Sequence, residues 1–138
     1  MPGTEMADDD DPRFGPGPFA GLLGFRILHA DRDGATVEAD PGPEHGNRIG
    51  IVHGGFLSAL LDTTTGWAVQ AHLPPGIGAP HVQMSIQYVR AAATGATLSC
   101  RGRCVSAGRS ICSAEAEITQ GDRVIARAVT SHAVLQAS

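Results

Sequence analysis

One apolar helical segment, residues 54–72, constrains the fold of this chain more than any other feature. Apolar side chains recur along it at helical spacing, among them Phe56, Leu60 and Trp67. A helix that is apolar on nearly all sides must be covered by other parts of the protein. The run Leu73-Pro74-Pro75-Gly76 predicts where the helix ends, because proline cannot continue a helix. We therefore expect one buried central helix.

The sequence around this helix shows the two-residue alternation that is typical of β-strands. Strands are predicted in segments 25–29, 35–39, 82–89, 97–104, 112–119 and 123–130. Short turns containing glycine separate most of them, and such tight connections favour antiparallel pairing. The sequence therefore predicts an α+β domain in which an antiparallel sheet wraps around one long central helix.

Length and charge limit the number of domains and the kinds of partner. The 138 residues fit one domain, placed at 19–138, after a Pro-, Gly- and Asp-rich segment, 1–18, that we expect to be disordered. The net charge is −4, and no clustered basic face indicates nucleic-acid binding. No apolar stretch reaches the roughly 18 residues of a membrane span, and no signal peptide opens the chain. We expect a soluble, cytoplasmic protein.

Three cysteines, Cys100, Cys104 and Cys112, lie inside predicted strands. They lack the paired spacing on turns that a zinc site needs, so we interpret them as free thiols in a reducing compartment. The sequence predicts no bound metal and no cofactor.

Asp62 is the residue that fits the apolar helix least well. A carboxylate buried between Leu61 and Trp67 would be costly, and burial would raise its pKa toward that of a base working near neutral pH. The alternative is that Asp62 lies on a hydrated stripe of the helix together with Thr63–Thr65. The sequence leaves these two interpretations open.

The start of the helix, His53-Gly54-Gly55, is the second candidate feature. The first turn of a helix leaves backbone N–H groups without partners, and the helix dipole adds partial positive charge there. Glycine at 54 and 55 would let a ligand approach this backbone, so the segment suits polarisation of a carbonyl group and binding of an oxyanion. The alternative is an ordinary helix start after a glycine-rich loop.

The spacing of these two features indicates more than one chain. Gly54 and Asp62 are eight residues apart, which corresponds to about 12 Å along a helix axis. One chain cannot bring both to a single reacting carbon. Two antiparallel copies of the helix would place Gly54 of one beside Asp62 of the other, so we expect a dimer with two equivalent sites.

The run from Asn47 to Trp67, NRIGIVHGGFLSALLDTTTGW, resembles the motif of the hotdog-fold thioesterase superfamily. It is most similar to the PaaI-like (phenylacetate-degradation) branch and its 4-hydroxybenzoyl-CoA thioesterase relatives. The resemblance extends over about residues 19–135 and includes the segment Gln87-Tyr88-Val89-Arg90. It implies a hotdog fold and a thioesterase activity.

The resemblance also implies roles for individual residues. Asp62 would be the general base or the nucleophile, and the Gly54 N–H would polarise the thioester carbonyl. Asn47 and His53 would orient water and the carbonyl, with Gly55 also contacting the substrate. Asn47 as a loop-turn residue, and His53 as a helix-start residue bonded to nearby backbone, are the structural alternatives.

Three further residues are candidates for substrate binding. Relatives often carry Ser or Thr facing the site near the start of the strand after the helix, whereas this chain has His81 there. His81 would contact water or substrate, or fill the wall of the pocket. Arg90 and Arg109 would bind the phosphates of coenzyme A. Solvated strand ends explain the arginines equally well.

The function implied by the resemblance is hydrolysis of an acyl-CoA to a free acid and coenzyme A. The partners would be the acyl-CoA substrate and a second copy of the chain in a homodimer, or in two paired dimers. The alternatives are a non-catalytic acyl-CoA-binding hotdog protein, and a thioesterase that acts on carrier-protein-bound acyl groups. The sequence does not identify the acyl group.

Overall fold

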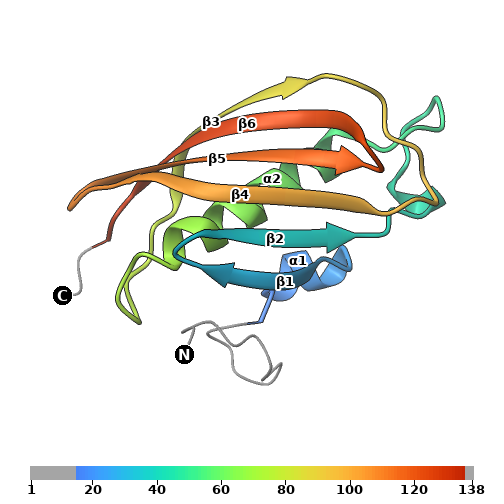
Figure 1. Cartoon of the computed structure of the whole chain (residues 1–138). Coiled ribbons are helices and arrows are strands. Elements are labelled where there is room, and N and C mark those ends of the chain that lie inside the picture. The colour runs from blue at the N-terminus through green and yellow to red at the C-terminus, as the bar shows by residue number, and fades with distance from the viewer. Residues whose placement is uncertain (1–14, 136–138) are drawn as a thin grey trace.

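Six strands form one antiparallel sheet in the computed structural model, which describes residues 15–135 (Figure 1). The strands are β1 (Arg26–Asp31), β2 (Gly34–Ala39), β3 (His81–Tyr88), β4 (Leu98–Ala107), β5 (Ile111–Gln120) and β6 (Arg123–Ala133). Their order in the sheet is β1-β2-β4-β5-β6-β3. Although β3 precedes β4 in the chain, it lies at the far edge, next to β6. The predicted antiparallel sheet is confirmed.

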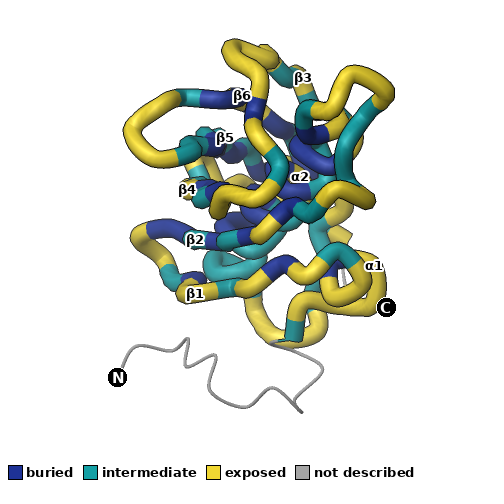
Figure 2. Tube along the Cα trace, turned by 90° about the vertical axis from the view of Figure 1, so that its right-hand side faces the viewer, coloured by how far each residue is buried: buried dark blue, intermediate teal, exposed yellow. Residues whose placement is uncertain are grey.

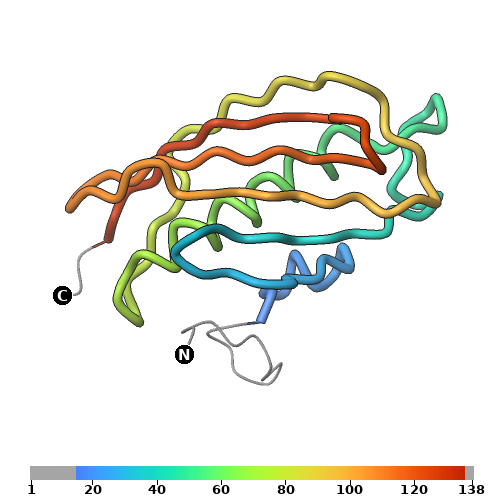
Figure 3. Tube along the Cα trace, in the orientation of Figure 1, coloured from blue at the N-terminus to red at the C-terminus, as the bar shows by residue number. Residues whose placement is uncertain are grey.

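One long helix, α2 (Gly54–Gln70), runs along one face of this sheet (Figures 1 and 3). It contacts β4, β5 and β2 most extensively. Leu60, Leu61 and Val69 are fully buried between helix and sheet. A Cβ atom added to Gly102 on β4 would lie 3.0 Å from Thr64 Cγ2, a tight contact, so glycine lets the helix pack closely against β4 here. The predicted central helix is confirmed, ending two residues earlier than expected.

The tube coloured by burial shows the core concentrated between α2 and the sheet, with exposed turns around it (Figure 2). Within residues 15–135, no helix is both long and apolar enough to cross a membrane.

The segment before β1 differs in part from the sequence prediction. Pro18–Leu22 forms a short helix, α1, that the alternation of side chains did not predict. Proline at its first position fits, because its missing N–H has no helical partner there. Of the segment predicted to be disordered, residues 1–14 lie outside the described residues, and Pro18 already belongs to α1.

The edge strand β3 buries only part of its predicted apolar face. Met84 and Ile86 pack against the core, whereas Val82 and Tyr88 are 60% and 54% exposed. The register with β6 shifts between His81 and Gln83, which disturbs the alternation at the start of the strand. An exposed edge with apolar side chains is therefore available along β3.

Candidate active site

His53 caps the N-terminus of α2. Its backbone is extended (φ −63°, ψ 138°), and its Nδ1 accepts a hydrogen bond from the Gly55 N–H at 2.7 Å. Since Nδ1 is an acceptor, the neutral ring carries its hydrogen on Nε2. His53 is therefore a helix-start residue bonded to nearby backbone, which is the structural alternative considered above. It leaves an exposed Nε2–H donor beside the start of the helix.

The Gly54 N–H is an available donor in the first turn of α2. In the described part of the chain no hydrogen bond uses it, whereas the next two N–H groups, of Gly55 and Phe56, are bonded to His53. The ring of Tyr88 lies beside Gly54, and its hydroxyl donates to the Gly54 carbonyl at 3.4 Å. A free N–H at the positive end of a helix dipole suits an anion or a developing oxyanion.

Gly55 is needed for local packing. A Cβ atom at this position would lie 2.9 Å from His53 Nδ1 and 3.1 Å from its Cε1, so any side chain would displace the capping ring. Glycine at position 55 therefore has a structural role, which is independent of any contact with substrate.

Asn47 organises the loop that leads to α2. Its Oδ1 accepts hydrogen bonds from the N–H groups of Ile49 (3.0 Å) and Ile51 (3.3 Å), and its own N–H donates to the Ile51 carbonyl at 2.8 Å. The loop-turn role considered for Asn47 is thus present. These bonds use the side-chain oxygen and leave the amide NH2 group as the donor that could reach a ligand.

Asp62 lies on the open side of α2 rather than within its buried face. Its side chain is 55% exposed, so the interpretation of Asp62 as a buried carboxylate is wrong for the single chain. The sheet covers the face of α2 that carries Leu60 and Leu61, and Asp62 follows on the adjacent, uncovered face. The close partner recorded for its carboxylate is His81, with Oδ2 3.5 Å from Nδ1.

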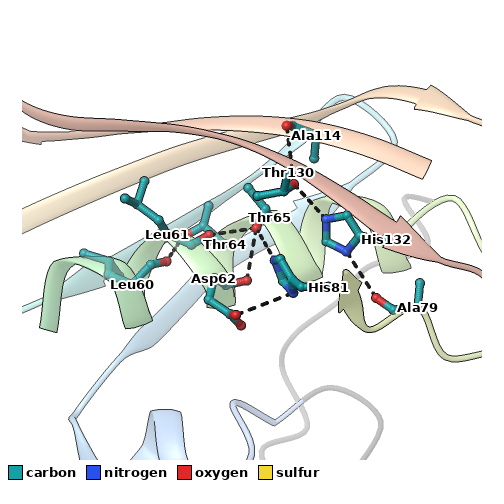
Figure 4. Close-up of polar contacts among 10 residues, drawn as sticks. All are labelled: Leu60, Leu61, Asp62, Thr64, Thr65, Ala79, His81, Ala114, Thr130 and His132. Carbon is teal, nitrogen blue, oxygen red and sulfur yellow. Dashed lines mark hydrogen bonds and ion pairs between the residues drawn. The ribbon is translucent and has the colours of Figure 1, made fainter. Parts of the chain in front are cut away.

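His81 belongs to a group of polar side chains between α2, β3 and β6 (Figure 4). We call Asp62, Thr65, His81 and His132 the Asp62 cluster. His81 Nε2 lies 2.8 Å from Thr65 Oγ1, and the His81 and His132 rings lie against each other, tilted by 45° with centroids 4.1 Å apart. Burial lowers the pKa of His81 below its ordinary value, and the nearby Asp62 charge opposes this shift only in part.

His132 and Thr65 are members of this group that sequence analysis did not select. His132 is fully buried on β6. Extending the inward alternation Ala126, Ala128, Thr130 by two residues would have predicted its burial. Its proximity to His81 depends on the pairing of β6 with β3, which the sequence pattern does not reveal.

The two candidate arginines lie at opposite ends of the sheet. Arg90 follows β3 where that strand meets the beginning of β6, and its Nη1 donates to the Val124 carbonyl at 3.0 Å. Arg109 lies in the turn between β4 and β5, at the end of the sheet where β3 begins. One chain therefore does not bring both to the same bound molecule.

The predicted site residues thus form two separate sets in a single chain. Asn47, His53, Gly54 and Gly55, which we call the helix-start group, lie at the beginning of α2. Asp62 lies two turns further along the same helix, about 12 Å away along its axis.

An open hollow of about 660 Å³ lies elsewhere, on the outer face of the sheet. Its lining includes Ser85, Gln87, Arg101, Arg103, Glu115, Glu117, Arg127 and Val129. None of the predicted site residues belongs to it. The chemistry predicted above is therefore associated with α2 and not with this hollow.

Within residues 15–135, no three His, Cys, Asp or Glu side chains are arranged to hold a metal ion. The three cysteines are all free thiols, and burial raises the pKa of Cys100 to about 12. A thiol with that pKa is not a nucleophile near neutral pH.

Comparison with known proteins identifies the family. A family model described as Thioesterase superfamily matches residues 49–127. A conserved protein of known structure from Pseudomonas aeruginosa is 30% identical, with a TM-score of 0.82 over 86% of this chain and 94% of that one. No curated protein matches significantly.

Two other solved structures carry more informative descriptions. A phenylacetic acid degradation-related protein from Ralstonia eutropha is 28% identical, with a TM-score of 0.80 over 88% of this chain and 93% of that one. A hypothetical thioesterase from Streptococcus pneumoniae, determined with coenzyme A, is 28% identical, with a TM-score of 0.75 over 83% and 88% of the two chains.

The fold and these similarities define a thioester hydrolase with the hotdog architecture. The chain belongs to the Thioesterase superfamily, since the family model spans more than half of its length. The predicted hotdog fold and the predicted PaaI-like branch are both confirmed.

Proposed function

We propose that this thioesterase hydrolyses acyl-coenzyme A to a free carboxylic acid and coenzyme A. The observation that carries the proposal is the pairing of an unused Gly54 N–H at a helix start with an exposed Asp62 carboxylate on the same helix. The first stabilises negative charge on a carbonyl oxygen, and the second accepts a proton or attacks a carbonyl carbon. The coenzyme A bound to the Streptococcus pneumoniae relative supports the choice of thiol.

The reaction assigns a task to each group. The Gly54 N–H binds the thioester oxygen as it becomes an oxyanion, and His53 Nε2–H is a second donor at the same helix start. Asp62 takes a proton from water, whose oxygen attacks the carbonyl carbon, and the C–S bond breaks to release the thiolate. In the other route Asp62 itself attacks, and water then hydrolyses the resulting anhydride. The thiolate takes up the proton in either route.

A second copy of the chain completes the site in this proposal. Gly54 and Asp62 are too far apart on α2 to act together, so an antiparallel α2 from a partner supplies the missing group. The outer edge of β3 has unpaired backbone groups and exposed Val82 and Tyr88, which favour pairing with another strand. Such pairing would also cover Asp62, which is open in the single chain.

Arg90 and Arg109 remain candidates for the coenzyme A phosphates. Because they lie at opposite ends of one sheet, a shared site would take them from different subunits. We place the reaction in the cytoplasm, in agreement with three free thiols.

The first test is release of free thiol from phenylacetyl-, hydroxybenzoyl-, hexanoyl- and palmitoyl-CoA, with wild type, Asp62→Asn and the exposed control Asp122→Asn compared. Asp62→Asn should lower turnover roughly 10²–10⁴-fold, the usual contribution of a general base. Asp122→Asn should remain active. A fully active Asp62→Asn enzyme would exclude the mechanism, and binding without turnover on every substrate would point to the binding protein or to carrier-protein substrates.

The second test addresses the shared site by mixing two inactive variants. Gly54→Pro removes the N–H donor and Asp62→Asn removes the carboxylate. If each site takes Gly54 from one subunit and Asp62 from the other, half of the sites in a mixed dimer are intact. Random exchange of subunits should therefore restore about a quarter of wild-type activity. Mixtures that exchange subunits and stay inactive would contradict the shared site.

A further inference from the structure

His81 presents one particular nitrogen to Asp62. The Thr65 hydroxyl lies 2.8 Å from the Leu61 carbonyl oxygen and 2.8 Å from His81 Nε2. The Thr65 hydroxyl donates to the helix carbonyls of Leu61 and, at 3.2 Å, Asp62, so its oxygen is left to accept the hydrogen of His81 Nε2. His81 therefore gains or loses its proton at Nδ1, the atom 3.5 Å from Asp62 Oδ2.

This geometry links the charge of His81 to the availability of Asp62. A neutral His81 leaves two acceptors side by side, Nδ1 and the carboxylate oxygen, to which a water molecule can donate both of its hydrogens. A protonated His81 instead directs Nδ1–H at Asp62 and pairs with it as an ion pair. The carboxylate would then be a weaker base. Asp62 needs a neutral neighbour to act.

His132 is arranged to favour that neutral neighbour. Its Nδ1 lies 3.1 Å from the Ala79 carbonyl oxygen and donates to it, so in the neutral ring Nε2 accepts from the Thr130 hydroxyl at 2.8 Å, which lies further, at 3.4 Å, from the Ala114 carbonyl oxygen. These two bonds fix a fully buried ring, which covers one side of the His81 ring at 4.1 Å. Figure 4 shows His132 held between Ala79 and Thr130, next to His81.

We propose that His132 is a positioning residue for hydrolysis: its fixed ring shields His81 from water and keeps it neutral, so that Asp62 stays free to act as the base. The proposal rests on the function assigned to Asp62 above. Among the described residues, the titratable groups that face His81 are Asp62 on α2 and His132 on β6. Asp62 favours the charged form of His81, and the His132 ring opposes that form by burying His81 away from water.

The direction of the pKa shifts agrees with this geometry. Burial lowers the pKa of His81 and of His132 below the ordinary value of 6.5, and proximity to His81 lowers that of His132 further. A smaller residue at position 132 would admit water to the His81 ring, and the loss of burial would raise the pKa of His81.

The test combines a pH profile with direct titration of His81 by NMR in wild type and His132→Gln. His81→Gln identifies the His81 signal among the six histidines. In His132→Gln the His81 midpoint should move to higher pH. The ratio of kcat at pH 6 to kcat at pH 8.5 should fall at least about threefold, because a higher His81 pKa lowers the fraction of neutral His81 at pH 6, by up to a factor of ten for each pKa unit. KM should not change.

Cys112→Ala is the matched control, because Cys112 is buried and lies directly opposite His132 across the β5–β6 pair. It should lower the melting temperature and leave the wild-type pH profile. If His132→Gln does not fold, Thr130→Val removes the hydroxyl that holds Nε2, so the His132 ring is no longer fixed over His81 and the His81 midpoint should move in the same direction. An unchanged His81 midpoint in the folded variant would overturn the proposal.

Thiol release and the NMR titration of His81 test the proposed function and this inference separately. Absence of thiol release from wild type with every acyl-CoA would refute the proposed function. The NMR midpoint would still show whether His132 controls the charge of His81.

Discussion

Replacement of Gly54 by proline removes the backbone N–H that the proposed oxyanion site uses, which makes it the sharpest perturbation of that site. Gly54 is the first residue of α2, the position at which helices accept proline best. His53 already has the extended backbone that the residue before proline prefers. No hydrogen bond in the described chain uses the Gly54 N–H, so folding loses none.

The structure also sets the expected magnitudes. A Cβ atom at position 54 would lie 3.5 Å from Tyr88 Cε1, an ordinary contact. Proline restricts the unfolded chain, so the free energy of unfolding should stay the same or rise by up to about 1 kcal/mol. Removal of one oxyanion donor typically lowers kcat about 10²–10³-fold, or roughly 2.7–4 kcal/mol of transition-state stabilisation.

The assay is thiol release on the best acyl-CoA, together with thermal unfolding of the same samples. Gly54→Ala is the matched control, because it adds the Cβ atom and keeps the N–H. It should retain far more activity than Gly54→Pro. If both variants lose activity equally, bulk near Tyr88 is responsible, and if Gly54→Pro keeps wild-type kcat, the oxyanion role of Gly54 is wrong.

Two further predictions concern capping and thiol reactivity. His53→Ala should lose about 1 kcal/mol of stability, because the Gly55 N–H loses its cap, whereas His53→Asn should keep the cap and lose only the Nε2 donor. Thermal unfolding and kcat measured on both variants would separate the two roles, and equal stability of the two would contradict the capping role. With a pKa of about 12, Cys100 should resist a thiol reagent at pH 8 in the native protein and react after unfolding. Peptide mapping by mass spectrometry checks this, and rapid labelling of native Cys100 would contradict its burial.

Local sequence patterns determined the elements of this fold. The apolar periodicity of residues 54–72 specified α2, because a helix without a polar face must be buried. Alternation and glycine turns specified the strands from β3 to β6, since both are encoded by neighbouring residues. Helix α1 escaped prediction because five residues do not establish a period.

The Asn47–Trp67 motif also identified the family and the residues to examine. It could not decide how exposed Asp62 is, because the face of α2 that the sheet covers depends on packing between elements distant in sequence. For the same reason, Asn47, His53 and Gly55 were found with local hydrogen-bonding or packing roles that a motif does not display.

Only the tertiary structure brought His81, Thr65 and His132 together. Residues 65, 81 and 132 meet because β3 crosses the sheet to pair with β6, and the end of α2 lies beneath both strands. Contacts between residues so far apart in the chain leave no periodic signal. The sequence determined which chemical groups this protein carries and on which elements. The order of the strands decided which of those groups lie beside one another.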